Sequence, residues 1–347
     1  MKIALITDAW FPQINGVVTT LRNVCEQLRE FGHQVEMCTP DQFRNWPCPG
    51  YPEIRLALGC GRRLSKRLDA LQPDAIHICT EGPLGCAART YCRRRGISYT
   101  TSFHTRFAEY LEMRSGIPAS WTYCFLRWFH SSSDKVMAAT PSLVEELRKR
   151  GFQSPVLWSR GVNTDIFKPR DKGFLDGARP ICLYAGRVAV EKNIEAFLRL
   201  DLPGTIYIVG DGPQRSGLEA KYPEVRFAGY HVGEDLAHHI AAADVFVFPS
   251  LTDTFGLVML EALACGVPVA AFPVQGPADV ILSDKVGCLN QDLRQAVLEA
   301  LKLSGKDCRA YSLAYAWEKC ARQFEGHLVR IVRSPQPRAI VWWRRYS

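Results

Sequence analysis

The chain has 347 residues and a formal net charge of +8, with 47% hydrophobic and 22% charged residues. This length exceeds what one hydrophobic core usually organises and the composition is that of globular proteins, so we expect two folded domains and no long disordered segment. No stretch approaches 18 uninterrupted apolar residues, which argues against a membrane-spanning helix.

The first residues and the cysteines both indicate a cytoplasmic protein. Residues 1–7, MKIALIT, form too short an apolar run for a signal peptide and suit a first buried strand. The 13 cysteines contain no Cys-x-x-Cys pair, and several stand in apolar segments, where a thiol behaves as a small hydrophobe. We therefore expect reduced thiols, with neither a disulfide framework nor a zinc site.

Strand-like apolar runs alternate with helical patterns along the chain, as in parallel α/β domains. In the first half the predicted strands are 3–7, 34–39, 75–79, 98–103, 135–139 and 156–158, with helices such as 19–31 and 142–150. In the second half the predicted strands are 181–185, 205–209, 225–228, 245–248 and 267–272, with helices such as 235–242 and 255–264.

A polar stretch with Pro and Gly, from Lys168 to Gly173, is the best candidate for a linker between two doubly wound, Rossmann-like domains. We expect a first domain over 1–168, a second over 169–309, a terminal helix over 310–333 that returns to the first domain, and a loose tail over 334–347. Ligands of such folds bind where the strands end, which here is the cleft between the two domains.

Two residues of the first domain follow predicted strands. Gly16 stands just before a helix, where a backbone can approach a phosphate or sugar closely, although a turn glycine without function is commoner. The Gly-x-Gly-x-x-Gly fingerprint of dinucleotide enzymes is missing there. His104 directly follows a strand, where an imidazole can bind a ligand hydroxyl or phosphate oxygen; a structural or exposed histidine is the alternative.

In the second domain, one cation ends a strand and another stands near the next helix. Arg187 follows the strand 181–185, and Lys192 is expected to open the helix that follows, so both charges and the helix N-terminus would favour an anion such as a departing diphosphate. A salt bridge from Arg187 to Glu191 is the alternative. Gly210 closes the strand 205–209, either as a plain turn or as a small residue that leaves room for a ligand.

Residues 249–261 are the most informative segment, because a buried strand runs there through a polar turn into a helix. If the helix includes both carboxylates, Asp253 and Glu261 are about 12 Å apart along its axis, the reach from a sugar ring to a ribose. Carboxylates accept hydrogen bonds from pairs of sugar hydroxyls. Alternatively Asp253 or Thr254 caps the helix and Glu261 is solvated, but an unpaired carboxylate in so apolar a helix needs a partner.

Positive charge is unevenly distributed, with clusters at 62–67, at 89–95 and in the tail at 342–346. Two interpretations of these clusters are open. They are solvated helix faces, or they bind an anionic partner such as a membrane surface or a phosphorylated acceptor. We do not expect nucleic acid as a partner, because the cations are not interleaved with stacking aromatic residues.

Taken together, these motifs resemble the family-4 retaining glycosyltransferases, which have the GT-B fold, over the chain up to about Ser334. The matching pieces are the Gly16 loop and residues 102–105, 160–163, 185–187 with Lys192, 210–213 and 253–261. The Thr-Asp-Thr-Phe-Gly form at 252–256 resembles the branch that includes GDP-mannose-dependent α-mannosyltransferases and sulfoquinovosyl- and glycolipid-forming enzymes.

The resemblance implies an acceptor side in the first domain and a nucleotide-sugar site in the second. The catalytic candidates are His104, Arg187, Lys192 and Asp253. The donor-binding candidates are Gly16, Arg187, Lys192, Gly210, Asp253, Phe255, Gly256, Leu257 and Glu261.

The resemblance assigns a part of the donor to several of these residues, and it places Gly16 on the diphosphate and acceptor side. Arg187 and Lys192 would hold the diphosphate, and Glu261 the ribose hydroxyls. Asp253, where the family usually has Glu, would grip the sugar together with two backbone amides, while His104 would touch its 6-position. The chain contains no Asp-x-Asp, so the two cations would replace a metal ion, and we expect no metal and no other cofactor.

The implied reaction is retaining transfer of a hexose, with mannose from GDP-mannose as the first choice, to a lipid or glycan acceptor at the inner face of the membrane. The donor diphosphate would act as the base, so the protein would contribute positioning and charge stabilisation. Two alternatives stay open: a sugar-nucleotide epimerase of the same architecture and a non-catalytic nucleotide-sugar sensor. A nicotinamide dehydrogenase is disfavoured by the missing glycine fingerprint.

Overall fold

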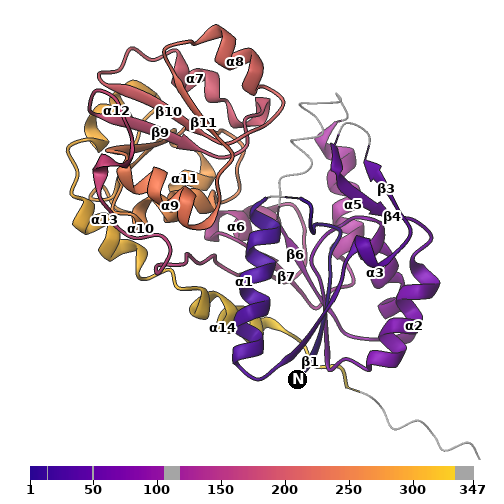
Figure 1. Cartoon of the computed structure of the whole chain (residues 1–347). Coiled ribbons are helices and arrows are strands. Elements are labelled where there is room, and N and C mark those ends of the chain that lie inside the picture. The colour runs from indigo at the N-terminus through magenta and orange to yellow at the C-terminus, as the bar shows by residue number, and fades with distance from the viewer. Residues whose placement is uncertain (14, 49–50, 105–117, 333–347) are drawn as a thin grey trace, which may run out of the picture.

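A computed structural model describes residues 1–13, 15–48, 51–104 and 118–332. These residues form two α/β halves, each built on a six-stranded sheet whose strand pairs are all parallel, and one separate antiparallel hairpin (Figure 1). The predicted fold class of two doubly wound α/β halves is confirmed. Thr105, the last residue of one predicted motif, and the tail 334–347 lie outside the described residues.

The first half follows the alternating scheme expected from the sequence. Its strands are β1 (Lys2–Ile6), β2 (Gln34–Cys38), β3 (Asn45–Cys48), β4 (Tyr51–Ala57), β5 (Ala75–Ile78), β6 (Thr100–Phe103), β7 (Lys135–Ala138) and β8 (Pro155–Leu157). Its helices are α1 (Gly16–Glu30), η1 (Pro40–Gln42), α2 (Gly61–Leu71), α3 (Pro83–Arg95), α5 (Ala119–His130) and α6 (Pro141–Lys149).

The second half has the same plan. Its strands are β9 (Ile181–Ala185), β10 (Thr205–Val209), β11 (Arg226–Gly229), β12 (Val245–Phe248), β13 (Val269–Ala271) and β14 (Gly287–Leu289). Its helices are η2 (Lys172–Phe174), η3 (Val190–Lys192), α7 (Ile194–Leu198), α8 (Arg215–Lys221), α9 (Gly233–Ala242), α10 (Leu257–Ala264), α11 (Gln275–Val280), α12 (Leu293–Ala300), α13 (Gly305–Ser312) and α14 (Trp317–His327).

In each sheet the chain first adds strands on one side of the sheet's first strand and then adds the remaining strands on its other side. The orders are β2-β1-β5-β6-β7-β8 and β11-β10-β9-β12-β13-β14, so Cys182 on β9 lies opposite Ile206 on one side and Val245 on the other. β12 is buried along its whole length, because helices cover both faces of a parallel sheet. Ligands of doubly wound folds bind where the order reverses, and in the second half this is the carboxyl end of β9 and β12.

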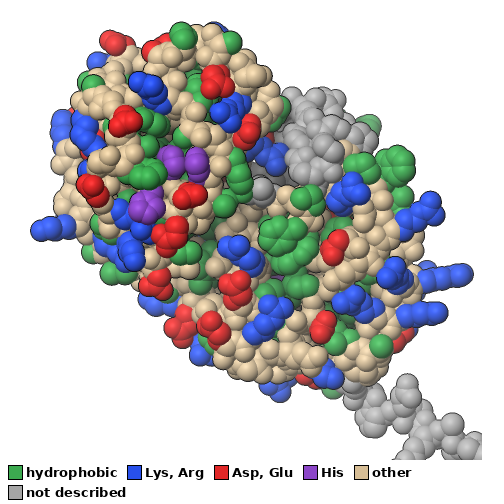
Figure 2. Space-filling model, in the orientation of Figure 1, with side chains coloured by type: hydrophobic (Ala, Val, Ile, Leu, Met, Phe, Trp, Pro, Cys, Tyr) green, Lys and Arg blue, Asp and Glu red, His purple; other side chains and the backbone are tan. Residues whose placement is uncertain are grey.

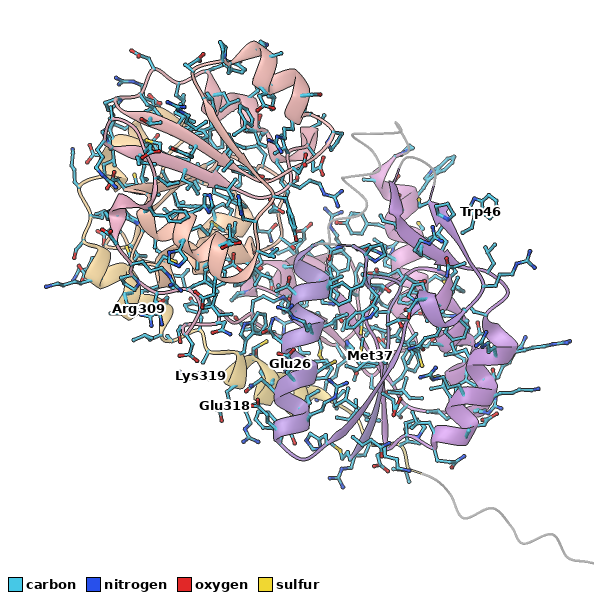
Figure 3. The ribbon with its side chains drawn as sticks, in the orientation of Figure 1. Glu26, Met37, Trp46, Arg309, Glu318 and Lys319 are labelled. Atoms are coloured by element: carbon cyan, nitrogen blue, oxygen red, sulfur yellow. The ribbon has the colours of Figure 1, made fainter. Side chains whose placement is uncertain are left out.

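The last helix lies against the first half, although it follows the second in sequence. α14 runs beside α1, and its Trp317, Cys320 and Phe324 are buried with Ile3 and Leu5 of β1 (Figure 1). The α13 residue Arg309, labelled in Figure 3, joins the segment between the two halves to the end of α10. Its guanidinium donates hydrogen bonds to the backbone oxygens of Thr164 at 3.0 Å, Phe167 at 2.7 Å and Ala264 at 2.9 Å.

Three features differ from the sequence-based expectations. The hairpin of β3 and β4 and the edge strand β14 were not predicted, and β3, Asn-Trp-Pro-Cys, lacks an apolar alternation. The segment 310–333 is not one helix, because α13 ends at Ser312 and α14 starts at Trp317. Between them the Tyr315 carbonyl accepts a hydrogen bond from Val162 N at 2.8 Å, which turns the chain toward the first half. The domain boundaries at 168 and 309 stay predictions.

Within the described residues, none of the helices combines the length and the apolar character that crossing a bilayer requires. The cysteines Cys38, Cys79, Cys182 and Cys265 are buried, as expected of thiols that pack as small hydrophobes.

Candidate functional site

Lys192 and Asp253 are brought together by the loops that follow β9 and β12. Asn193 donates a side-chain hydrogen bond to Pro249 O at 3.1 Å, and Ser250 Oγ donates one to Glu191 O at 3.3 Å. These bonds hold the η3 turn over the end of β12. As a result Lys192 Nζ lies 2.6 Å from Asp253 Oδ1 and 2.8 Å from Oδ2, in a bidentate ion pair whose two side chains are each 23% exposed.

The surroundings of Lys192 correct one expectation from the sequence. Lys192 ends the 3₁₀ turn η3, Asn193 adopts a left-handed conformation with φ 51°, and the helix that follows has only five residues. So short a helix carries little dipole, because the dipole grows with aligned peptide units. Any anion held here is therefore stabilised by side-chain charge. The half-buried Arg187 stands on the same loop, and Tyr184 anchors its backbone by donating to Arg187 O at 2.9 Å.

The helix after β12 begins later than predicted. α10 starts at Leu257, and Gly256 precedes it with φ 79°, a left-handed conformation that favours glycine. Asp253 therefore lies in the turn before the helix and does not cap it. The separation of about 12 Å inferred for two carboxylates on one helix does not apply, because Glu261 alone is helical. Within the described residues, the amides of Phe255 and Gly256 donate no hydrogen bond.

Glu261 is a desolvated carboxylate that has no partner among the described residues. Burial raises its pKa from an ordinary 4.5 to about 7. Some of the residue's surface remains accessible, so the side chain is half-buried and can be reached from outside. Among the residues the structure describes, none forms a hydrogen bond or ion pair with its carboxylate. Leaving an ionised carboxylate in this state is costly, and a ligand with hydroxyl donors would relieve the cost.

His104 is buried at the carboxyl end of β6, and its ring is fixed by Arg160. Arg160 Nη2 donates to His104 Nδ1 at 3.1 Å, and burial together with this charge holds the pKa of His104 well below its usual value. A neutral imidazole that accepts at Nδ1 carries its proton at Nε2. His104 Nε2 is buried and has no hydrogen-bond partner in the described part of the chain, so it presents an unused N–H donor.

Arg160 is a site residue to which the sequence analysis gave no role of its own. Its guanidinium donates to Trp158 O at 2.7 Å and Ser159 O at 3.2 Å and lies 4.5 Å from the centre of the Trp158 ring. The only sequence signal was its place in the matching piece 160–163. Its effect on His104 depends on a contact between residues 56 positions apart, which the sequence does not reveal.

The two halves meet at the candidate site. Thr254 Oγ1, in the loop after β12, donates to His104 O at 2.9 Å. Gly16 is the first residue of α1, whose start is capped by Asn15 Oδ1 accepting from Val17 N and Val18 N at 3.0 Å. A Cβ atom at Gly16 would lie 3.5 Å from Leu257 Cδ1. Gly16 and His104 thus each lie beside the segment 254–257 that leads into α10.

Packing accounts for a glycine at position 210, and the sequence-based interpretation that Gly210 leaves room for a ligand stays a prediction. It has φ 151°, and a Cβ atom there would lie 1.9 Å from Gly186 O, which is a severe collision. The loop after β10 therefore sits directly on the loop after β9. The interpretation of Gly210 as a residue that leaves room for a ligand is not needed to account for a glycine at this position.

No group of three or more His, Cys, Asp or Glu side chains suited to hold a metal ion occurs among the described residues.

Comparison with known proteins identifies the relatives of this chain. A model of glycosyltransferase family 4 matches residues 14–166, and a model of group 1 glycosyl transferases matches residues 179–303. The GDP-mannose-dependent alpha-mannosyltransferase of Mycolicibacterium smegmatis is 31% identical over 83% of this chain and 84% of its own length. Sulfoquinovosyl transferase SQD2 of Arabidopsis thaliana is 27% identical over 99% of this chain and 75% of its own.

Solved structures share the fold at lower sequence identity. Sucrose-phosphate synthase from Thermosynechococcus elongatus superposes with a TM-score of 0.78 at 24% identity, covering 94% of this chain and 97% of the other. HepE of Anabaena, solved with UDP, superposes with a TM-score of 0.71 at 14% identity, covering 94% and 99%. These matches show that the fold predicted from the resemblance is correct.

Proposed function

The chain belongs to the family-4 glycosyltransferases of the GT-B fold, and from that premise we propose that it transfers mannose from GDP-mannose to a lipid or glycan acceptor. The choice of mannose is supported by relatives from two further species, Mycobacterium tuberculosis and Corynebacterium glutamicum, which are also named GDP-mannose-dependent alpha-mannosyltransferases. The choice of a lipid acceptor is supported by the similarity to sulfoquinovosyl transferase SQD2 and to an alpha-monoglucosyldiacylglycerol synthase.

The observation that carries the proposal is the desolvated carboxylate of Glu261, which has no partner in the part of the chain that the structure describes. Burial raises its pKa to about 7 in the absence of a ligand, so the protein maintains an unfavourable group at this position. A ribose offers two adjacent hydroxyls, which can both donate to one ionised carboxylate. We assign the ribose of the donor to Glu261 for this reason.

The diphosphate would lie at Arg187 and Lys192. In the reaction, the bond between C1 of the sugar and the diphosphate oxygen breaks, and negative charge grows on the leaving group. Two fixed cations stabilise that charge in a partly dehydrated site, so a metal ion is not required in this proposal. The acceptor oxygen bonds to C1 on the same face, and its proton passes to an oxygen of the departing diphosphate, which leaves no task for an enzymatic nucleophile.

The sugar would lie between the two halves. Asp253 accepts hydrogen bonds from its hydroxyls, and the amides of Phe255 and Gly256 donate to it. His104 donates its Nε2 proton to a sugar oxygen, because the contact with Arg160 leaves Nε2 as the N–H side of the ring. The neighbouring Gly16 and Leu257 would close the acceptor side.

Transfer from a panel of nucleotide sugars tests the proposal. Purified protein is first screened by thermal shift with GDP-mannose, UDP-glucose, UDP-galactose and UDP-sulfoquinovose, and the donor that stabilises it is then offered to extracted lipids. We expect GDP-mannose to stabilise the protein and a mannosylated lipid to form. Stabilisation by a uridine donor alone would reject the mannose assignment. Conversion of donor without acceptor, followed by nuclear magnetic resonance, would reveal an epimerase, which no finding here favours.

A further inference from the structure

Helix α5 (Ala119–His130) exposes large aromatic side chains to solvent. Trp121 is 73% exposed, Phe125 39% and Trp128 46%, and their spacing of four and three residues places them on one face of the helix. The opposite face, with Tyr123, Leu126 and Phe129, is already buried in the core. α5 is therefore apolar on two sides, and the side with Trp121, Phe125 and Trp128 is exposed to solvent.

α5, α3 and α2 lie next to one another on one side of the first sheet (Figure 1). From α3, Arg89 donates to Trp128 O at 2.7 Å and to Phe129 O at 2.9 Å, and its guanidinium carbon lies 4.0 Å from the centre of the Trp128 ring. On its other side α3 packs against α2. The three helices thus form one continuous surface, called here the α5–α3–α2 face.

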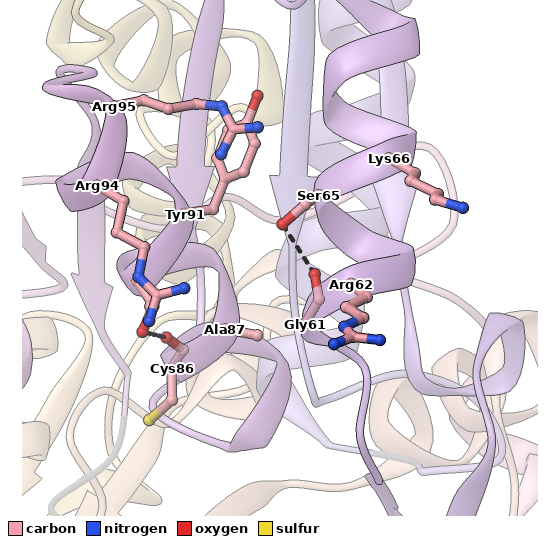
Figure 4. A pocket seen from close by; sticks show the side chains of 10 residues that line it. Gly61, Arg62, Ser65, Lys66, Cys86, Ala87, Tyr91, Arg94 and Arg95 are labelled. Atoms are coloured by element: carbon pink, nitrogen blue, oxygen red, sulfur yellow. Dashed lines mark hydrogen bonds between the residues drawn. The ribbon is translucent and has the colours of Figure 1, made fainter.

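This face is strongly cationic. The three helices contain nine Lys and Arg residues and a single carboxylate, Asp69, which is paired with Arg95 at 2.9 Å. Between α2 and α3 runs a groove of about 610 Å³ whose cationic lining residues are Arg62, Lys66, Arg94 and Arg95 (Figure 4). Figure 2 shows Lys and Arg side chains projecting along the side of the molecule where α2 and α3 lie.

We propose that the α5–α3–α2 face docks on an anionic lipid bilayer, with the aromatic side chains of α5 in the headgroup layer and the cations of the groove on lipid phosphates. Tryptophan and arginine suit this layer, because each combines apolar surface with a polar group. Cations near an anionic membrane add to the binding free energy. A second copy of the chain fits the charge poorly, since Arg89 is buried but the other eight cations would meet eight like charges.

The proposal rests on the proposed lipid acceptor and adds the surface by which the protein reaches it. α5 ends at His130, just before β7 begins at Lys135, so its last turn lies at the amino edge of the sheet and its first turn, with Trp121, at the carboxyl edge. His104 and the candidate site lie at that same edge. A bilayer that contacts Trp121 would therefore face the edge of the sheet where the acceptor must enter.

Flotation with acceptor-free vesicles tests the inference in the full-length protein, without any donor. The vesicles are phosphatidylcholine alone or phosphatidylcholine with phosphatidylglycerol. We expect the wild type to float only with the anionic vesicles. The double variants Trp121→Ser/Phe125→Ser and Arg62→Glu/Arg94→Glu should each lose about tenfold or more in vesicle affinity. Thermal unfolding of each variant checks that the fold is retained.

Matched controls come from the second half of the chain. Leu282 is 68% exposed, and Lys285 and Lys306 are exposed cations. Leu282→Ser and Lys285→Glu/Lys306→Glu should leave flotation unchanged. The inference is overturned if the wild type does not float, if the controls lose as much affinity as the test variants, or if Trp121→Ser/Phe125→Ser breaks a dimer in sedimentation velocity while flotation persists. Because no sugar is transferred, failure of the proposed reaction would leave these results unaffected.

Discussion

Lys192 and Asp253, 61 residues apart in sequence, form a bidentate ion pair, with the ammonium nitrogen 2.6 and 2.8 Å from the two carboxylate oxygens. In the proposed function these residues act on different parts of the donor, the diphosphate and the sugar. The pair neutralises both charges before the donor binds. It also fixes both side chains at the end of β12, so that little side-chain entropy remains to be lost on binding.

Replacing Lys192 by Ala should lower turnover by about 10²–10³, the scale for losing one preorganised group that stabilises charge in the transition state. The measurement is kcat with the donor and acceptor identified by the panel. Lys221→Ala is the matched control, because Lys221 belongs to the same half but pairs with Glu195 on the surface. Turnover like that of the wild type in Lys192→Ala would contradict the diphosphate assignment.

Glu261→Gln should remove a pH dependence of stability. Burial raises the pKa of Glu261 from 4.5 to about 7, so between these values the folded protein holds a proton that the unfolded chain releases. Stability from this group is therefore present below about pH 4.5 and is lost as the pH rises to 7. In urea unfolding without ligand, the wild type should lose stability across this window relative to Glu261→Gln.

The same variant tests the ribose contact. The ionised carboxylate accepts the ribose hydroxyls, so nucleotide binding should expel a proton from Glu261 and strengthen as the pH rises from 6 to 8. By calorimetry with the bare nucleoside diphosphate, Glu261→Gln should bind about tenfold more weakly or worse at pH 8. The ionisation of the nucleotide itself is common to both proteins and cancels in the comparison. Equal affinities would refute the ribose role.

Substitutions of His104 should distinguish its two ring nitrogens. The amide of Gln can place an N–H group near the position of Nε2, whereas the shorter Asn reaches only the position of Nδ1. We expect His104→Asn to lower kcat/KM by about 10² and His104→Gln to lower it less. If Asn is the better replacement, the proton that matters is not at Nε2.

Arg160 is the positioning residue in this arrangement, and ¹⁵N magnetic resonance of the imidazole reports its effect directly. The wild-type His104 should carry its proton at Nε2 and stay neutral at a pH where an ordinary histidine is protonated, because burial and the Arg160 charge hold its pKa well below the usual value. In Arg160→Met the pKa should rise toward the ordinary value. A role in packing alone would leave the His104 signals unchanged.

Gly16→Ala tests whether Gly16 is needed for substrate binding or for folding. A Cβ atom at Gly16 would lie in ordinary van der Waals contact with Leu257 Cδ1 at 3.5 Å, so the substitution should leave the melting temperature unchanged. If Gly16 faces the donor or acceptor, the added methyl group should raise KM while the fold is retained. An unchanged KM would remove Gly16 from the site.

Much of the fold followed from the sequence, because apolar runs and turn residues are local signals. The strands 181–185, 205–209 and 245–248 have the bounds that the structure shows. The strand β3, with its polar residues and proline, gave no such signal, and the break between α13 and α14 depends on a contact of Tyr315 with Val162. Local patterns cannot report contacts between distant segments.

For the site, the sequence by itself determined which residues stand at the ends of strands and that a carboxylate such as Glu261 in an apolar helix needs a partner. Only the tertiary structure decided that Asp253 precedes the helix and pairs with Lys192, and that Arg160 fixes the proton of His104. The physical reason is distance. Charge pairing and hydrogen bonding act over about 3 Å in space, and each of these pairs joins loops that follow different strands of one sheet, so the groups meet only when that sheet has formed.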